Sequence, residues 1–197
     1  MSVHSRASLW STLAMAALCL AGTAASAGNP QQAAAGHPTY TDDEVAKAAN
    51  AFFKHGAQDL GNVLQKVLKE KGQPVAIIRG EEAGGAIGVG VRYGHGELVY
   101  KGSAGRQVYW QGPSIGFDLG ANAVKVFALV YDLPGSDQLF ARFPGVEGSL
   151  YFIGGFGVNY VQNGSIVVAP VRFGVGWRQG LRVGYMHFSP KKRLNPF

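Results

Sequence analysis

The sequence has a single cysteine, Cys19, which lies inside an apolar run near the start of the chain. We expect this run to be removed on export, so that the mature chain carries no cysteine. Such a chain forms no disulfide bond, thiolate nucleophile or cysteine zinc site. Lipid attachment at Cys19 is not expected either, because Leu18 stands where lipid-modified cysteines normally have a small residue.

Motifs for metal and nucleotide binding are also missing. Four histidines follow the apolar run, and none has the spacing of metal ligands: His37, His55, His95 and His187. Two glycine runs, 84–90 and 154–157, continue into strand-like sequence rather than into a helix, and no Gly-Lys-Ser/Thr follows them. No serine is singled out as a nucleophile. We therefore expect no cofactor, no metal and no enzymatic activity.

The start of the chain has the features of a cleavable export signal. His4 and Arg6 precede an apolar run from Leu9 to Leu20, and Ala25-Ser26-Ala27 fits a cleavage site. The run is shorter than the roughly 20 residues of a membrane-spanning helix. We predict a signal peptide at 1–27, a disordered lead-in at 28–39 and one domain at 40–197, which places the protein in the periplasm.

The charge is positive, with 18 Lys and Arg against 12 Asp and Glu. A basic exported protein meets phospholipid headgroups, lipopolysaccharide phosphates and anionic wall polymers, to which it is attracted in a salt-sensitive way. Nucleic acid is not an expected partner, because the basic residues are scattered and export separates the protein from nucleic acid.

One long helix is expected at the start of the domain. Thr41 and Glu44 fit a capping box, with Tyr40 and Val45 as the flanking apolar pair. Apolar residues then recur at three- and four-residue spacing until 71–74 end the helix: Val45, Ala49, Phe52, Phe53, Leu60, Leu64, Val67 and Leu68. The mixed charge of the opposite face favours packing on a sheet over lying on a membrane.

From Val75 onward the pattern is that of short strands separated by glycine-containing turns. We predict strands at 75–79, 86–93, 96–101, 106–111, 114–120, 124–131, 149–160, 165–172, 174–178 and 181–188. The turns include Gly94-His95-Gly96, 102–105 and the hairpin dipeptide Asn163-Gly164, and a short helix around Leu139, Phe140 and Phe143 is expected to end at 144–145. The predicted fold class is mainly β: a small antiparallel barrel-like domain of about ten strands with one long N-terminal and one short helix.

We predict a ligand pocket where polar side chains of the strands face the interior of the barrel. Glu81 and Glu82 are adjacent, so their side chains point to opposite faces of a strand and cannot act together. Trp110 and Gln111 begin a segment that we place at a strand end, where a pocket can open. The candidate ligand-binding residues are Glu82, Arg92, Trp110, Gln111 and Arg172.

Several segments resemble a bacterial envelope family typified by envelope integrity protein A (EipA). The matching segments are 80–86, 98–100, 109–118, 129–131, 142–143, 145–149 and 195–197, and Trp110-Gln111-Gly112-Pro113-Ser114 is the most specific of them. The resemblance implies a small periplasmic β-barrel-like protein linked to envelope integrity and stress resistance, without known enzymatic activity. The glycine-rich strands are more faintly similar to SYLF lipid-binding domains, which implies a phospholipid or another envelope component as partner.

The expected function is thus non-enzymatic support of the envelope through binding of an envelope lipid, a wall polymer or a periplasmic protein, with peripheral membrane contact. Two alternatives stay open. The first is an integral outer-membrane barrel, suggested by the terminal Phe197, although Pro190, Pro196 and charged alternate residues fit its last strand poorly. The second is an enzyme that modifies lipid or wall polymer at the corner from Trp110 to Ser114, with His95 or His187 near a nucleophile.

Overall fold

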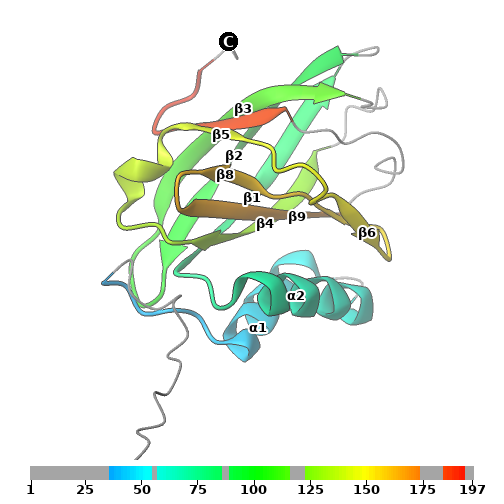
Figure 1. Ribbon diagram of the computed structural model, residues 1–197, viewed down its shortest axis with the longest axis vertical. Helices are drawn as coiled ribbons and strands as arrows, with labels where there is room; N and C mark the ends of the chain where they lie inside the picture. Colours follow the sequence, from blue (N-terminus) through cyan, green and yellow to red (C-terminus); the bar gives the residue numbers. More distant parts are fainter. Residues whose placement is uncertain (1–35, 55–56, 86–88, 116–122, 174–183, 194–197) are drawn as a thin grey trace, which may run out of the picture. The chain divides into compact units, whose positions relative to one another are not determined.

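The computed structural model describes residues 36–54, 57–85, 89–115, 123–173 and 184–193. This part of the chain holds two α-helices, one 3₁₀ helix and ten strands (Figure 1). The helices are α1 (Asp42–Phe53), α2 (Ala57–Lys71) and η1 (Ser136–Leu139). The strands are β1 (Ala76–Gly85), β2 (Val89–Tyr100), β3 (Arg106–Ile115), β4 (Val124–Tyr131), β5 (Arg142–Pro144), β6 (Tyr151–Ile153), β7 (Phe156–Val158), β8 (Val161–Asn163), β9 (Ile166–Phe173) and β10 (Tyr185–Ser189).

The predicted start of the first helix is confirmed, but the helix is not continuous. Thr41 accepts a hydrogen bond from the backbone N–H of Glu44, and the Glu44 carboxylate accepts one from the N–H of Thr41. The prediction of one long helix is wrong, because Lys54 adopts a left-handed conformation with φ of 63° and donates its N–H to Asn50. That geometry ends α1, and α2 begins three residues later.

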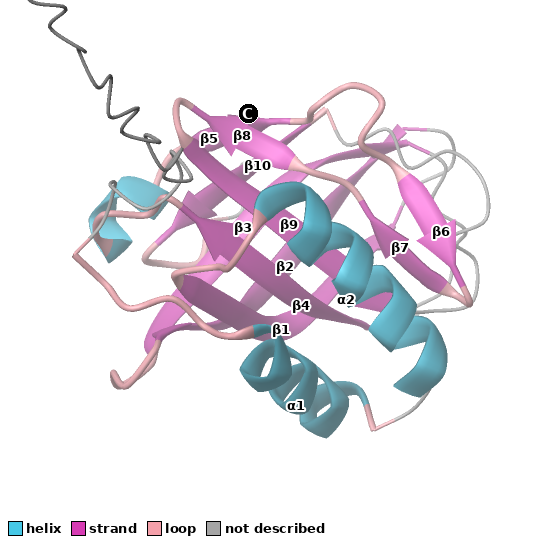
Figure 2. Cartoon of the chain, turned by 60° about the horizontal axis from the view of Figure 1, so that its bottom comes forward, coloured by secondary structure: helices cyan, strands magenta, loops and turns pink. Residues whose placement is uncertain are grey.

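Both helices cover one face of the sheet, as their apolar stripe predicts (Figure 2). Seven of the eight stripe residues are buried, and Phe52 is partly buried. They pack against side chains on the outer face of β1, β4, β7 and β9: Ile77, Phe127, Leu129, Phe156, Val158, Ala169 and Val171. Apart from Ala169, each such side chain contributes about 1.5–3 kcal/mol when fully buried, so this layer attaches the helices firmly to the sheet.

The strands form one antiparallel sheet that is curved into a half-barrel. The strand order is β5-β10-β3-β2-β1-β4-β9-β7-β6, and β8 pairs with the first part of β9. An isolated bridge between Gly145 and Val161 ties the end of β5 to β8, so the two sides of the sheet meet at that point. The predicted mainly β, barrel-like fold is confirmed.

A second apolar core fills the inner face of the sheet. It includes Ile78, Leu98, Val108, Trp110, Val126, Ala128, Val130, Phe143, Val168, Met186 and Phe188. In β4, the residues of this inner core alternate with Phe127, Leu129 and Tyr131, which face the helices. A strand buried on both faces reads as a continuous apolar run rather than as alternation.

The turn predicted at Gly94-His95-Gly96 is wrong, because β2 runs without a break through these residues. A Cβ added to Gly94 would lie 2.1 Å from Cε2 of Trp110, and one on Gly96 would lie 2.4 Å from the backbone oxygen of Arg79. Glycine is required here by close packing inside a strand rather than by a turn.

Other predicted boundaries also change. The break between Gln111 and Ser114 is absent, since β3 pairs with β2 as far as Ile115. The single strand predicted at 149–160 is instead the hairpin of β6 and β7, whose turn residues Gly154 and Gly155 have φ of 54° and 86°.

The hairpin predicted at Asn163-Gly164 is confirmed and joins β8 to β9, although Gly164 and Ser165 form its loop and Asn163 pairs with Ile166. The predicted short helix is the 3₁₀ turn η1, and Phe143 lies in β5 beyond it. The predicted strand 174–178 and parts of 86–93, 114–120 and 181–188 lie outside the described residues.

Candidate functional site

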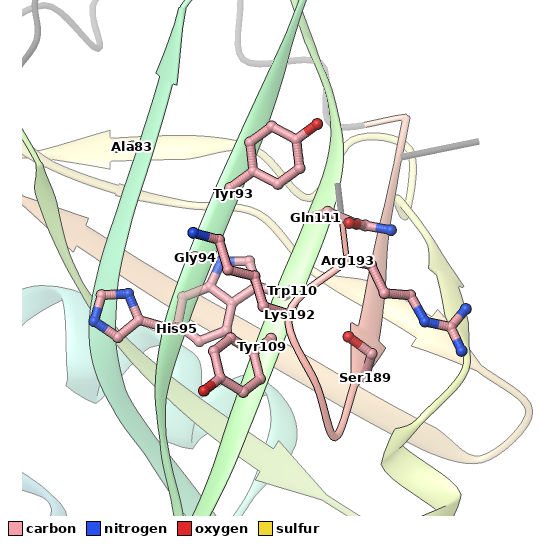
Figure 3. A pocket seen from close by; sticks show the side chains of 10 residues that line it. All are labelled: Ala83, Tyr93, Gly94, His95, Tyr109, Trp110, Gln111, Ser189, Lys192 and Arg193. Carbon is pink, nitrogen blue, oxygen red and sulfur yellow. The ribbon is translucent and has the colours of Figure 1, made fainter. Parts of the chain in front are cut away.

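A pocket lies on the outer face of β2 and β3, beside β10, with Ala83 of β1 at its edge (Figure 3). Its volume is about 410 Å³. Ten residues line it: Ala83, Tyr93, Gly94, His95, Tyr109, Trp110, Gln111, Ser189, Lys192 and Arg193. A volume of this order falls within the range of small-molecule sites.

Strand register places the polar side chains of this pocket next to one another. Tyr93 of β2 is paired with Gln111 of β3, and His95 is paired with Tyr109. Ser189 of β10 is paired with Tyr109 on its other side. Alternation along each strand points these five residues to the outer face, while their neighbours point into the core.

The chain turns back over the sheet after β10. The Ser189 hydroxyl donates a hydrogen bond to the backbone oxygen of Lys191, at 2.8 Å. Figure 3 shows the Lys192 side chain lying across the sheet toward Tyr93 and His95, whereas Arg193 lies on the side of Ser189. This segment therefore forms one wall of the pocket without belonging to any strand.

The pocket has a positive electrostatic character. Lys192 and Arg193 are exposed, and neither forms an ion pair within the described part of the chain. None of the ten lining residues is an aspartate or glutamate. Close by, burial lowers the pKa of His187, and the positive charges of Arg193 and Arg142 lower it further.

On the inner face, a charged network is buried in the same region of the sheet. Glu82 of β1 accepts hydrogen bonds from Trp110 Nε1 at 2.9 Å and from Arg172 Nε at 3.0 Å. Arg172 also donates to Oδ1 of Asn159 at 2.7 Å. Arg92 Nη1 lies 4.0 Å from Glu82 Oε1. Glu82, Arg92 and Arg172 are each at most 1% exposed.

This network holds two positive charges against one negative charge. Burial by itself raises the pKa of Glu82, but Arg172 and Arg92, together with hydrogen bonds from Arg172 and Trp110, outweigh burial and lower it. Burial lowers the pKa of Arg92 to about 10, against the opposing effect of Glu82. Among the described residues, Nε and Nη1 of Arg92 have no hydrogen-bond partner. Arg92 is thus the least satisfied member of the network.

The structure brings four of the five predicted site residues together, but away from solvent. Glu82, Arg92, Trp110 and Arg172 converge on the inner face, whereas Gln111 lies on the outer face and lines the pocket with part of Trp110. The role predicted for these residues in ligand binding stays a prediction.

Sequence reasoning missed most of the pocket. Tyr93 is predicted only as a strand residue, and the turn predicted at His95 does not exist. Lys192 and Arg193 belong to the run Lys191-Lys192-Arg193, three consecutive basic residues that could have been noticed. Asn159, which completes the buried network, carried no signal in the sequence.

Residues 112–116 form a Gly-x-Ser-x-Gly pattern, which singles out Ser114 against the expectation that no serine is marked as a nucleophile. In hydrolases this pattern forms a sharp turn from strand to helix, which exposes the serine. Here Ser114 continues β3 in register with Gly90 of β2. In the pocket, the Ser189 hydroxyl donates to a backbone oxygen rather than to a histidine. Among the described residues, no group of three or more His, Cys, Asp or Glu could hold a metal ion.

Neither α1 nor α2, nor any other helix of the described segments, has the length and apolar character needed to cross a membrane. Residues 38–197 match the family described as Envelope integrity protein A. A solved structure from Brucella abortus, described as a beta-barrel-like, uncharacterized protein, superposes with a TM-score of 0.73. It is 38% identical in sequence, and the match covers 81% of this chain and 99% of the Brucella chain. No curated protein matches the chain.

Proposed function

Because the chain belongs to the envelope integrity protein A family, we propose that it supports the cell envelope as a non-enzymatic periplasmic protein that holds an envelope component in the pocket beside β10. The observation that carries this proposal is the pocket itself. It combines a preformed sheet surface with aromatic, amide and cationic groups, which is the composition of a recognition site.

The helix layer supports this proposal over an integral outer-membrane barrel. In such a barrel the outer face of the strands contacts lipid and the interior is polar. In this protein α1 and α2 bury Ile77 of β1 and the outer face of β4, β7 and β9, and the inner face is largely apolar. Release of the protein by osmotic shock, without detergent, tests the proposed periplasmic location.

The serine environments support binding rather than catalysis. A hydrolase at the corner from Trp110 to Ser114 would need a serine activated by histidine and exposed to substrate. Ser114 lies within a continuous strand, and Ser189 is hydrogen-bonded to the backbone of Lys191.

The test is a deletion of the gene followed by complementation in the native host. Deletion should sensitise cells to detergent and to wall-directed antibiotics. The wild-type gene and the control Lys191→Gln should restore resistance, and the pocket variant Tyr109→Ala/Lys192→Gln should not, although it accumulates to the same level. If the pocket variant restores full resistance, the pocket is not the functional site.

A second measurement addresses the bound component directly. Native mass spectrometry with lipid extraction, on protein purified from its own envelope, should show a co-purifying species that is lost from the pocket variant. If the wild type and the pocket variant both show only the mass of the polypeptide, the search should turn to protein partners, through crosslinking in cells.

A further inference from the structure

We propose that the pocket beside β10 binds an anionic sugar, that is, a hexose ring carrying a phosphate or carboxylate group. This inference rests on the proposed function, because it names the ligand class of the same pocket.

The positive wall selects for an anionic group. Lys192 extends over the sheet toward His95, and Arg193 lies on the opposite side of the pocket (Figure 3). With no carboxylate in the lining, these cations are available to an incoming phosphate or carboxylate. Both side chains are exposed, so the attraction should weaken as salt is added.

The floor suits a sugar ring. Tyr93 and Tyr109 lie on one face of the sheet, diagonally across β2 and β3. Gln111 is the register partner of Tyr93, and His95 is the register partner of Tyr109. An aromatic face packs against the C–H face of a sugar, while the tyrosine hydroxyls and the exposed imidazole of His95 satisfy the hydroxyls at its rim. A volume of about 410 Å³ also exceeds what a lone phosphate ion fills.

The lining disfavours an acyl chain. Apart from Ala83, no aliphatic side chain lines the pocket, since its apolar surface comes from Tyr93, Tyr109 and Trp110. Sites for lipid tails are lined mainly by hydrophobic side chains, which here face the core instead. A lipid therefore fits this pocket only through a sugar-containing headgroup.

The experiment is isothermal titration of the purified full-length mature protein with four probes: glucose 1-phosphate, galacturonate, glucose and inorganic phosphate. We expect both anionic sugars to bind at least tenfold more tightly than glucose and than phosphate, and we expect this preference to fall as sodium chloride is raised. Binding of glucose as tight as that of the two anionic sugars would overturn the proposal, and so would binding of phosphate as tight as that of glucose 1-phosphate.

Matched variants assign the binding to the pocket. Lys192→Gln and Tyr109→Ala should each weaken the binding of glucose 1-phosphate at least tenfold, whereas Lys191→Gln removes the same charge one residue away and should change it less than twofold. Lys191 and Lys192 are both exposed and outside the strands, so both variants should keep the thermal midpoint of the wild type. An equal loss with the two lysine variants would show non-specific attraction and reject the site.

Further probes distinguish the source of the sugar. Tighter binding of an oligosaccharide that ends in the same anionic sugar points to a polymer, and equal binding points to the terminal sugar alone. Vesicles of phosphatidylglycerol, an anionic lipid without sugar, should bind no better than inorganic phosphate, and strong binding to them would overturn the sugar part of the proposal.

Failure of this inference is separable from failure of the proposed function. If no anionic sugar binds but the pocket variant still fails to restore envelope resistance, the ligand class is wrong and the function stands. If the sugars bind at Lys192 but the variant restores resistance fully, the site is real and its proposed role in the envelope is wrong.

Discussion

Trp110 of β3 reaches across β2 to donate its indole N–H to Glu82 of β1, at 2.9 Å. The residue of β2 that it crosses is Gly94, which is the register partner of both. A side chain on Gly94 would occupy the space of the indole ring. One glycine thus permits a hydrogen bond between two strands that are not neighbours in the sheet.

Gly94→Ala should destabilise the fold by about 1–3 kcal/mol, the usual cost of overpacking a filled core. The added Cβ would lie 2.1 Å from Trp110 Cε2, which forces the indole away from Glu82. Chemical denaturation measures the change. Gly61→Ala is the matched control: Gly61 lies in α2 with no atom near its added Cβ, so this variant should be more stable by about 0.5–1 kcal/mol. Equal effects of the two substitutions would contradict the packing argument.

The two buried arginines should respond in opposite ways to removal of charge. Arg172→Met should cost about 3–5 kcal/mol, because it removes the main partner of a fully buried carboxylate. Arg92→Met should be neutral or stabilising by about 1 kcal/mol, since Arg92 carries unpartnered donors and the excess charge. Urea unfolding of both variants at pH 7 distinguishes them, and a larger loss for Arg92→Met would show that the network depends on both cations.

Glu82 should make the fold sensitive to acid. Its folded-state pKa is lowered below the ordinary glutamate value of 4.5, so its stabilising effect is complete above that value. The effect is lost as the pH falls through the still lower folded-state pKa. Glu82→Gln should be less stable at pH 7 and should lose less free energy of unfolding between pH 5 and pH 3. Parallel pH profiles for wild type and variant would contradict this linkage.

Thr41→Ala should destabilise the protein by about 1 kcal/mol, because it removes the hydroxyl that caps α1. Thr41→Ser keeps a capping hydroxyl and should stay within a few tenths of a kcal/mol of the wild type. Thermal unfolding followed by circular dichroism measures both. If the serine variant is as unstable as the alanine variant, the methyl group of Thr41 matters rather than its hydrogen bond.

Sequence reasoning succeeded where a residue acts through its neighbours in the chain. Thr41 and Glu44 are three residues apart, and their capping box was predictable from local physics. The alternation that places Glu82 inside and Glu81 outside follows from strand geometry, and the structure bears it out.

Sequence reasoning failed where a residue responds to a distant strand. Gly94 and Gly96 have the composition of a turn, and only the position of Trp110 and the backbone of β1 explains why they lie in a strand. The place of Lys192 in the pocket is not predictable for a related reason. It depends on the chain turning back after β10, which no periodic pattern in the sequence predicts.

The floor and the charged wall of the pocket differ in how they are connected to the rest of the fold. Its floor, with Tyr109 and Gln111, lies on a strand whose inner side forms the core. Its charged wall lies on exposed residues that belong to no strand. Substitution of Lys192 or Arg193 should therefore change the charge of the pocket wall without disturbing the strands that form its floor.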